Sequence, residues 1–106
     1  MKYLLSILAL FILSSTASSA IASPGKAVSY NVGGEAYEGY YISPSPAAPL
    51  VVLVHDWDGL TGYEVKRAAM LADLGYAVFA ADLFGKGVRP TELKEKRHLT
   101  GELYKD

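Results

Sequence analysis

The clearest pattern in this chain is a pair of uninterrupted apolar runs separated by a segment with helical periodicity. Residues 50–54 and 76–81 are apolar or aromatic throughout, as expected for strands buried within a sheet. Apolar residues recur at helical spacing over residues 63–74, opposite charged ones, which predicts an amphipathic helix. Because a helical crossover joins the two strands, they should lie parallel in one sheet.

The ends of the predicted helix carry their own signals. Thr61 can cap the first turn with its hydroxyl, while Glu64, three residues later, can accept a hydrogen bond from the Thr61 backbone N–H. Gly75 supplies the stop at the other end. These residues predict a helix that starts with a capping box and ends at Leu74.

The segment before the first apolar run predicts a hairpin. Residues 26–32 and 36–42 are rich in Val and Tyr and flank Gly33 and Gly34, which can adopt the positive φ angles of a tight turn. We expect an antiparallel hairpin at the edge of the sheet, and its imperfect alternation leaves open which face is buried. The proline-rich residues 43–49 predict an extended connector.

The segment after the second apolar run predicts a loop and then a helix. Residues 82–87 should leave the strand as a loop at the same edge of the sheet as residues 55–58. From about residue 90 or 91 a charged segment continues to residue 106, with apolar anchors that include Leu99 and Leu103, and it predicts a second helix. No stop signal follows, so we expect the chain to be the N-terminal part of a longer protein.

The first 22 residues have the features of a secretory signal peptide. Lys2 precedes an apolar core over residues 3–13, and a tract of small residues ends in Ala20-Ile21-Ala22. A membrane anchor is the competing interpretation, but a span needs about 20 strongly apolar residues and hydroxyl side chains interrupt this tract. We therefore predict cleavage after Ala22, export to the periplasm or the medium, and no stable membrane anchor in the mature chain.

Composition narrows the possible partners. The 106 residues are 51% hydrophobic and 20% charged, which fits one globular domain at most. The net charge of -1 gives no basic footprint and argues against a nucleic-acid partner. The chain has no cysteine, so neither a disulfide framework nor a cysteine-based zinc site is available. We expect no metal and no cofactor.

Polar residues gather directly after the first apolar run, where ligands collect in open α/β sheets. His55, Asp56 and Asp58 permit several interpretations, of which the simplest is a turn with Asp side chains bonded to backbone N–H groups. A calcium loop fails because its first and last ligand positions would fall on Val54 and Val65. A phosphate-binding helix start lacks the glycine-rich fingerprint. An acyl-hydrolase site is a further interpretation, which rests on a resemblance to a known family.

Three stretches carry a resemblance to a known family. Leu53-Val54-His55-Asp56-Trp57-Asp58-Gly59-Leu60, then Leu74-Gly75-Tyr76-Ala77-Val78, and Ala81-Asp82-Leu83-Phe84-Gly85 resemble the dienelactone hydrolase family of α/β-hydrolases. The resemblance extends from about residue 38 to residue 85 and continues more weakly to residue 106. It implies an α/β fold, a three-layer sandwich when complete, of which residues 23–106 form a partial domain. It also implies a small-molecule ester or lactone substrate.

The resemblance also assigns site residues. Asp56 lies where the family has a glutamate that activates the nucleophile, so its side chain is one methylene shorter. The backbone N–H of Trp57 lies where the family has one donor of the oxyanion hole. Arg89 and Arg97 lie, with His98, in the region where members can place substrate-binding basic groups, although solvated surface charge is the competing interpretation.

The sequence lacks the group that would attack a substrate. Members need a nucleophile elbow, Gly-x-Ser/Cys-x-Gly, followed by an acid and a histidine. No serine or cysteine occurs from residue 46 onward, so the domain stops before the elbow and this chain by itself should be inactive. The alternative function is a non-catalytic or truncated α/β module that binds a small molecule or a partner at the same edge.

Overall fold

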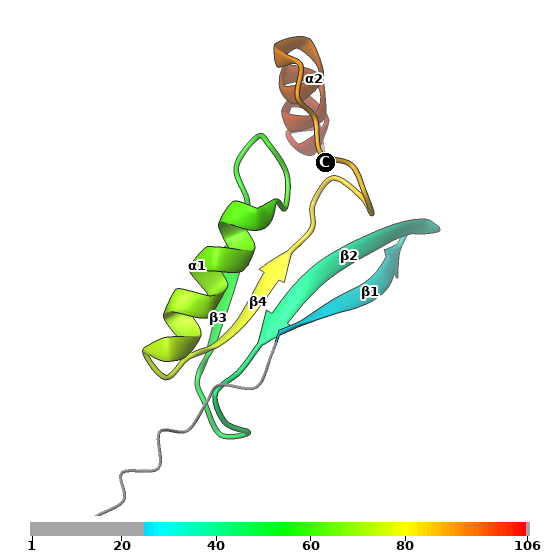
Figure 1. Cartoon of the computed structure of the whole chain (residues 1–106). Helices are drawn as coiled ribbons and strands as arrows, with labels where there is room; N and C mark the ends of the chain where they lie inside the picture. The colour runs from blue at the N-terminus through cyan, green and yellow to red at the C-terminus, as the bar shows by residue number, and fades with distance from the viewer. Residues whose placement is uncertain (1–24, 106) are drawn as a thin grey trace, which may run out of the picture.

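The computed structural model describes residues 25–105, so the predicted signal peptide lies outside the described residues. A four-stranded sheet carries one helix on one of its faces, and a second helix lies beyond the carboxyl ends of its parallel strands (Figure 1). The elements, in chain order, are β1 (Lys26–Val32), β2 (Glu35–Ile42), β3 (Leu50–Val54), α1 (Gly62–Asp73), β4 (Ala77–Ala81) and α2 (Leu93–Leu103). The strand order is β1-β2-β4-β3.

The predicted hairpin is confirmed at one edge of the sheet. β1 pairs antiparallel with β2, and Gly33 and Gly34 turn the chain with φ angles of 57° and 85°. Tyr30 lies opposite Tyr37 in this register, and their rings stack with centroids 5.6 Å apart. The sequence left open which face of the hairpin is buried. The stacked rings of Tyr30 and Tyr37 lie on the face of the sheet that α1 does not cover, so the buried face is the one toward α1.

The predicted β-α-β crossover is also confirmed. β3 and β4 run parallel, with Val52 opposite Phe79, and β4 pairs antiparallel with β2 on its other side. β4 begins at Ala77 rather than at residue 76, because the Tyr76 N–H is hydrogen-bonded to the Leu71 carbonyl at the end of α1.

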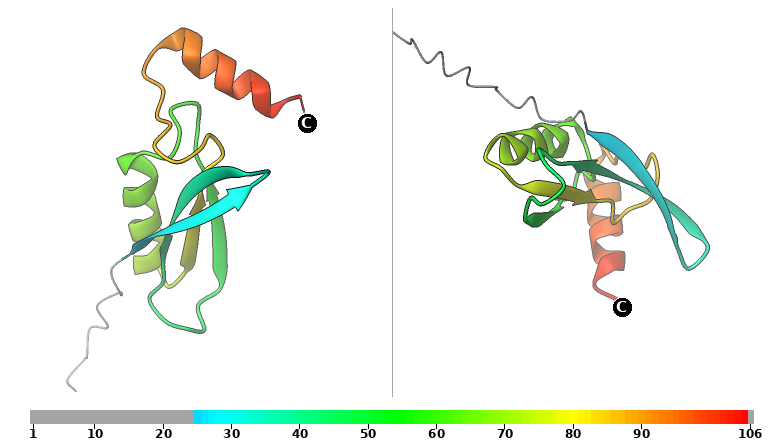
Figure 2. Two further views of the ribbon diagram at one scale, coloured as in Figure 1. Left: turned by 90° about the vertical axis from the view of Figure 1, so that its right-hand side faces the viewer. Right: turned by 90° about the horizontal axis from the view of Figure 1, so that it is seen from below.

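The core lies between α1 and one face of the sheet (Figure 2). Ala68 and Ala72 on α1 are fully buried against Ile42 of β2 and Val78 of β4. Alanine at these two positions lets the helix approach the strands closely. The Thr61–Glu64 capping box is present and fixes the start of α1, with the Thr61 N–H donating to Glu64 Oε2 at 2.8 Å.

The prediction that residues 50–54 form a buried strand is wrong for one face. β3 is the last strand in the sheet, and Leu50, Val52 and Val54 are 60%, 58% and 59% exposed. Leu53 points the other way and packs against the core under α1. The resemblance implies three layers only for the complete domain, and residues 25–105 supply the sheet and the layer formed by α1.

The second helix is shorter than predicted and packs loosely. α2 begins at Leu93 and ends at Leu103, and it has no buried residue. It lies beyond the carboxyl ends of β3 and β4 (Figures 1 and 2). Among residues 25–105, neither helix has the length and apolar character needed to cross a membrane.

Candidate active-site rim

His55 joins the two loops that follow the parallel strands. Its Nε2 accepts a hydrogen bond from the Leu83 N–H at 3.0 Å, which places the ring proton on Nδ1. Nδ1 in turn donates to the Asp56 carbonyl at 2.7 Å. The imidazole is buried against the Phe84 ring, with centroids 4.7 Å apart. Both ring nitrogens are therefore engaged by backbone groups.

Asp82 organises the second loop from within. Its fully buried carboxylate accepts hydrogen bonds from the backbone N–H groups of Glu38, Phe84 and Gly85, each at 3.1 Å. The Tyr30 hydroxyl donates to the Asp82 carbonyl at 2.7 Å and accepts from its N–H at 2.9 Å. Burial raises the pKa of Tyr30 above 10.0. The side chain and the backbone of Asp82 therefore both hold the loop against the hairpin.

Asp56 forms the turn that the simplest interpretation predicts. Its Oδ1 accepts from the Asp58 N–H at 3.0 Å, and its carbonyl accepts from the Gly59 N–H at 3.1 Å. The residue is exposed, and within residues 25–105 its Oδ2 accepts no hydrogen bond. One carboxylate oxygen holds the turn while the other remains available.

Trp57 lies beside Asp56 at the edge of a small hollow of about 160 Å³. Its backbone N–H donates to no group in the described part of the chain, and the residue is 47% exposed. The hollow lies between the two loops and α2, and is lined by His55, Asp56, Trp57, Leu83, Phe84, Thr100 and Leu103. The structure therefore brings Asp56 and Trp57 together around one concave space.

Sequence reasoning missed the contribution of α2 to this space. Lys96 forms an ion pair with Asp58, and its Nζ lies 5.6 Å from the centroid of the Trp57 ring. Thr100 lines the hollow, and its buried Oγ1 has no hydrogen-bond partner within residues 25–105. No local pattern could reveal these contacts, because they join segments far apart in the chain.

The two arginines do not line the hollow. Arg89 donates to the carbonyls of Val88 and Gly85 at 2.7 and 3.3 Å, and its Nη1 lies 3.7 Å from the Asp82 carboxylate. Arg97 is exposed on α2. In this arrangement Arg89 supports its own loop. Substrate binding by Arg89 and Arg97 stays a prediction.

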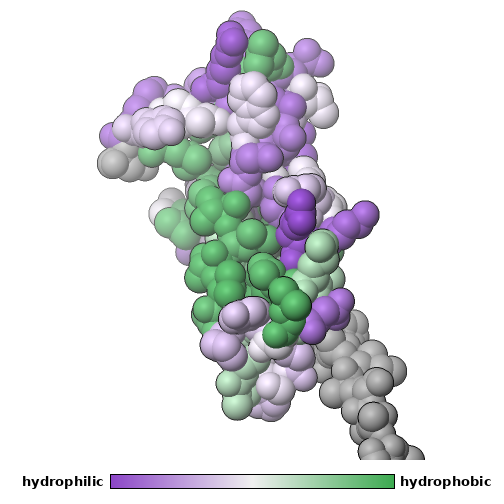
Figure 3. Space-filling model, turned by 90° about the vertical axis from the view of Figure 1, so that its left-hand side faces the viewer, coloured by the Kyte–Doolittle hydropathy of each residue, from purple (hydrophilic) through white to green (hydrophobic). Residues whose placement is uncertain are grey.

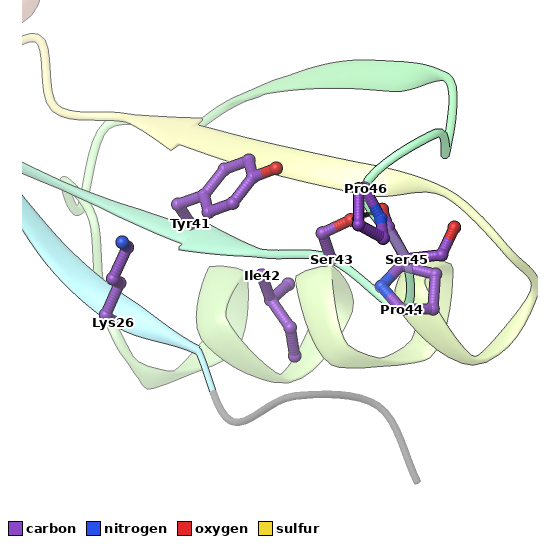
Figure 4. Close-up of a pocket in the computed structure, with 7 residues that line it drawn as sticks. All are labelled: Lys26, Tyr41, Ile42, Ser43, Pro44, Ser45 and Pro46. Atoms are coloured by element: carbon purple, nitrogen blue, oxygen red, sulfur yellow. Dashed lines mark hydrogen bonds between the residues drawn. The ribbon is translucent and has the colours of Figure 1, made fainter. Parts of the chain in front are cut away.

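A second hollow lies at the opposite end of β2 and offers less chemistry (Figure 4). It measures about 300 Å³ and is lined by residues at the ends of β1 and β2 and by the proline-rich connector. The Ser43 hydroxyl is already used, because it donates to the Ser45 carbonyl at 2.6 Å. Residues 25–105 also contain no group of three or more side chains suited to hold a metal ion.

Comparison with known proteins shows a family and two solved relatives. The sequence pattern of the Dienelactone hydrolase family matches residues 37–106, more than half of the chain. The protein called m3DLH is 28% identical, with a TM-score of 0.70 over 76% of this chain and 35% of its own length. A dienelactone hydrolase-like promiscuous phosphotriesterase from metagenomic libraries is 27% identical, with a TM-score of 0.69 over 77% of this chain and 36% of its own. No curated protein matches significantly.

Proposed function

The chain belongs to the dienelactone hydrolase family, and we propose that it forms one wall of an active site that hydrolyses carboxylic esters or lactones. In this proposal the Trp57 N–H is one donor of the oxyanion hole, and Asp56 is the carboxylate that activates the nucleophile. The chain spans about a third of the length of the solved structures that it matches. The attacking group is expected from sequence outside residues 1–106.

The observation that carries this proposal is the unused backbone N–H of Trp57 at a concave site. An oxyanion hole needs a donor that is fixed before the reaction and free of other partners, and losing one such donor costs about 10² to 10³ in rate. The turn held by Asp56 fixes the peptide next to this N–H. The carbonyl oxygen of a substrate could therefore bind to the Trp57 N–H without a rearrangement of the loop.

Asp56 has the chemistry required of the activating carboxylate but a shorter reach than glutamate. Its Oδ2 is free of hydrogen bonds within residues 25–105, so it can accept one from a nucleophile. Its other oxygen stays on the Asp58 N–H, which limits how far the side chain can move. A nucleophile in this site must therefore approach the loop closely.

A second activity, hydrolysis of phosphotriesters, is favoured by the similarity to the solved phosphotriesterase. Its transition state also places negative charge on an oxygen, so the same N–H donor would serve.

The alternative to both activities is a non-catalytic module. The absence of serine and cysteine after Ser45 supports that alternative for the 106-residue chain.

The test compares the chain with any longer product of its coding region. With a chromogenic acyl ester, the 106-residue chain should give no turnover above buffer, because it lacks a nucleophile. A reading frame that continues past Asp106 into Gly-x-Ser/Cys-x-Gly, an acid and a histidine should give an active product. In that product, D56N should lower kcat by about 100-fold, whereas D56E should retain activity. The control D73N changes an exposed aspartate and should leave kcat unchanged.

Three results would contradict these assignments. Turnover by the 106-residue chain that resists serine reagents would refute the argument from the missing nucleophile. Unchanged kcat in D56N would remove Asp56 from the mechanism. A stop codon directly after Asp106 would favour the non-catalytic module. Running a chromogenic phosphotriester in parallel separates the two proposed activities.

We also propose that the protein is exported. The support is the pattern of Lys2, the apolar residues 3–13 and the small residues before Ser23. N-terminal sequencing of protein from the periplasm or the medium should begin at Ser23. Recovery of the intact N-terminus in the membrane fraction would instead show an anchor.

A further inference from the structure

The peptide group between Asp56 and Trp57 is fixed from its carbonyl side. His55 Nδ1 donates to the Asp56 carbonyl oxygen at 2.7 Å, and the Gly59 N–H donates to the same oxygen at 3.1 Å. The carbonyl and the N–H of one peptide group share a plane and point in opposite directions. Holding the carbonyl therefore also sets the direction of the Trp57 N–H, which donates to no group within residues 25–105.

His55 can donate to this carbonyl because a distant backbone group fixes its tautomer. Its Nε2 accepts from the Leu83 N–H at 3.0 Å, so the proton of the neutral ring lies on Nδ1. The two hydrogen bonds form a chain from the Leu83 N–H through the imidazole to the Asp56 carbonyl. Hydrogen bonds in such a chain polarise one another, which strengthens the Trp57 N–H as the last donor. His55 thus links the loop after β4 to the peptide at the hollow.

This arrangement requires a neutral ring. A protonated imidazole carries a proton on both nitrogens, so its Nε2–H would face the Leu83 N–H with no acceptor between the two donors. His55 is only 8% exposed and its ring packs against Phe84, so water has little access to the ring. A buried donor without a partner is costly. Protonation should therefore move the ring, or one of the two loops, out of this arrangement.

The surroundings of the ring do not compensate a positive charge. Within residues 25–105 the His55 ring forms no ion pair. Figure 3 shows hydrophilic side chains over α2 and a hydrophobic area over α1 and β3, but α2 lines the hollow beside the ring only with Thr100 and Leu103, which do not titrate. The titratable groups of the neighbouring elements have other partners: Asp56 the Asp58 N–H, Asp58 Lys96, Asp82 backbone N–H groups and Arg89, Glu38 Lys86, and Tyr30 the Asp82 backbone.

We propose that His55 is a positioning residue whose neutral ring fixes the direction of the Trp57 N–H and whose protonation releases it from the loop after β4. The role of this N–H as an oxyanion donor rests on the proposed function, whereas its dependence on His55 does not. Histidine ordinarily changes its charge between pH 5 and 8. The direction of the Trp57 N–H should therefore change within that range.

The 106-residue chain allows a direct test, because Trp57 is its only tryptophan. NMR spectra from pH 8 to 5 would follow the backbone amide signals of Trp57 and Leu83 together with the ring signals of His55. We expect all of them to shift with one common midpoint, and the emission of Trp57 to change with it. H98Q removes the other histidine, which is exposed on α2, and should leave this transition unchanged.

Two substitutions separate the two hydrogen bonds of the imidazole. In H55Q the side-chain oxygen can accept from the Leu83 N–H but does not titrate, so the transition should disappear while the Leu83 amide stays protected from exchange. In H55N a donor remains near the position of Nδ1, but the side chain is too short to reach Leu83. Protection of the Leu83 amide should then fall by about tenfold, while the Trp57 amide signal stays close to that of the unaltered chain.

Amide signals of Trp57 and Leu83 that stay constant from pH 8 to 5 would overturn the proposal, and so would a transition that persists in H55Q. The titration of the unaltered chain gives this answer even if a variant fails to fold. None of these measurements depends on turnover. A common transition combined with an inactive longer product would support the role of His55 and contradict the proposed function. An active product whose Trp57 amide ignores the titration of His55 would do the reverse.

Discussion

At the residue scale, three polar side chains hold the loops of the rim in place: the buried His55 and Asp82 and the half-buried Tyr30. His55 and Asp82 accept hydrogen bonds from backbone N–H groups, and the Tyr30 hydroxyl pairs with both backbone groups of Asp82. A buried backbone group that loses its partner costs about 1–3 kcal/mol. These side chains therefore act by positioning the residues around them, and the candidate chemistry falls to the neighbouring exposed Asp56 and to the Trp57 N–H.

Tyr30 makes the free energy of unfolding depend on pH in the alkaline range. Burial raises its pKa in the folded protein above the ordinary value of 10.0, so the folded state holds the proton more strongly than the unfolded state. Its contribution to the free energy of unfolding is fully present below pH 10 and falls as pH rises from 10 through the folded pKa. Urea unfolding between pH 7 and 11 should show this decline.

The variant Y30F isolates the effect of this hydroxyl. It should lower the free energy of unfolding at pH 7 by about 1–3 kcal/mol, because Asp82 loses a donor and an acceptor. It should also lose part of the decline above pH 10. Y104F is the control, since Tyr104 is 86% exposed. An alkaline decline in Y30F equal to that of the unaltered chain would disprove the assignment.

At the element scale, the two helices are stabilised by different means. α1 has a capping box and buries Ala68 and Ala72 against the sheet. α2 has no side-chain cap and no buried residue, and Lys96 links it to the loop after β3. A partly exposed ion pair such as Lys96–Asp58 contributes up to about 1 kcal/mol, and a lysine near an aromatic ring adds about 0.5–1 kcal/mol. α2 should therefore open more readily than α1.

The variant K96M tests this link between α2 and the rim. Losing about 1 kcal/mol should speed amide exchange in α2 by roughly fivefold, while exchange in α1 and β4 stays the same. K94M, at an exposed position of the same helix, is the matched control. Equal exchange rates in the two variants would show that Lys96 does not hold α2 in place.

At the scale of the whole molecule, the described part of the chain covers one face of its sheet and leaves the other open. The buried apolar cluster consists of Ile42, Ala68, Ala72 and Val78, with partly buried neighbours around it. The uncovered face carries a hollow of about 550 Å³, lined by Tyr30, Tyr37, Phe79 and further apolar side chains. Small domains are marginally stable even when complete.

The sequence by itself determined the local elements and the family. Gly33 and Gly34 specify the turn, Thr61 and Glu64 specify the helix start, and helical periodicity between two apolar runs specifies the parallel crossover. Each signal acts over a few residues, so it can be read without knowing the rest of the fold. The motifs around Asp56 and Asp82 are similarly short.

The tertiary structure decided which strand lies at the edge and which side chains meet at the rim. An apolar run is the same in sequence whether a strand is central or terminal, so the exposure of β3 followed only from the order β1-β2-β4-β3. The contacts of His55 with Leu83 and of Lys96 with Asp58 join distant segments. Their geometry depends on how the loops and α2 pack, which no local pattern specifies.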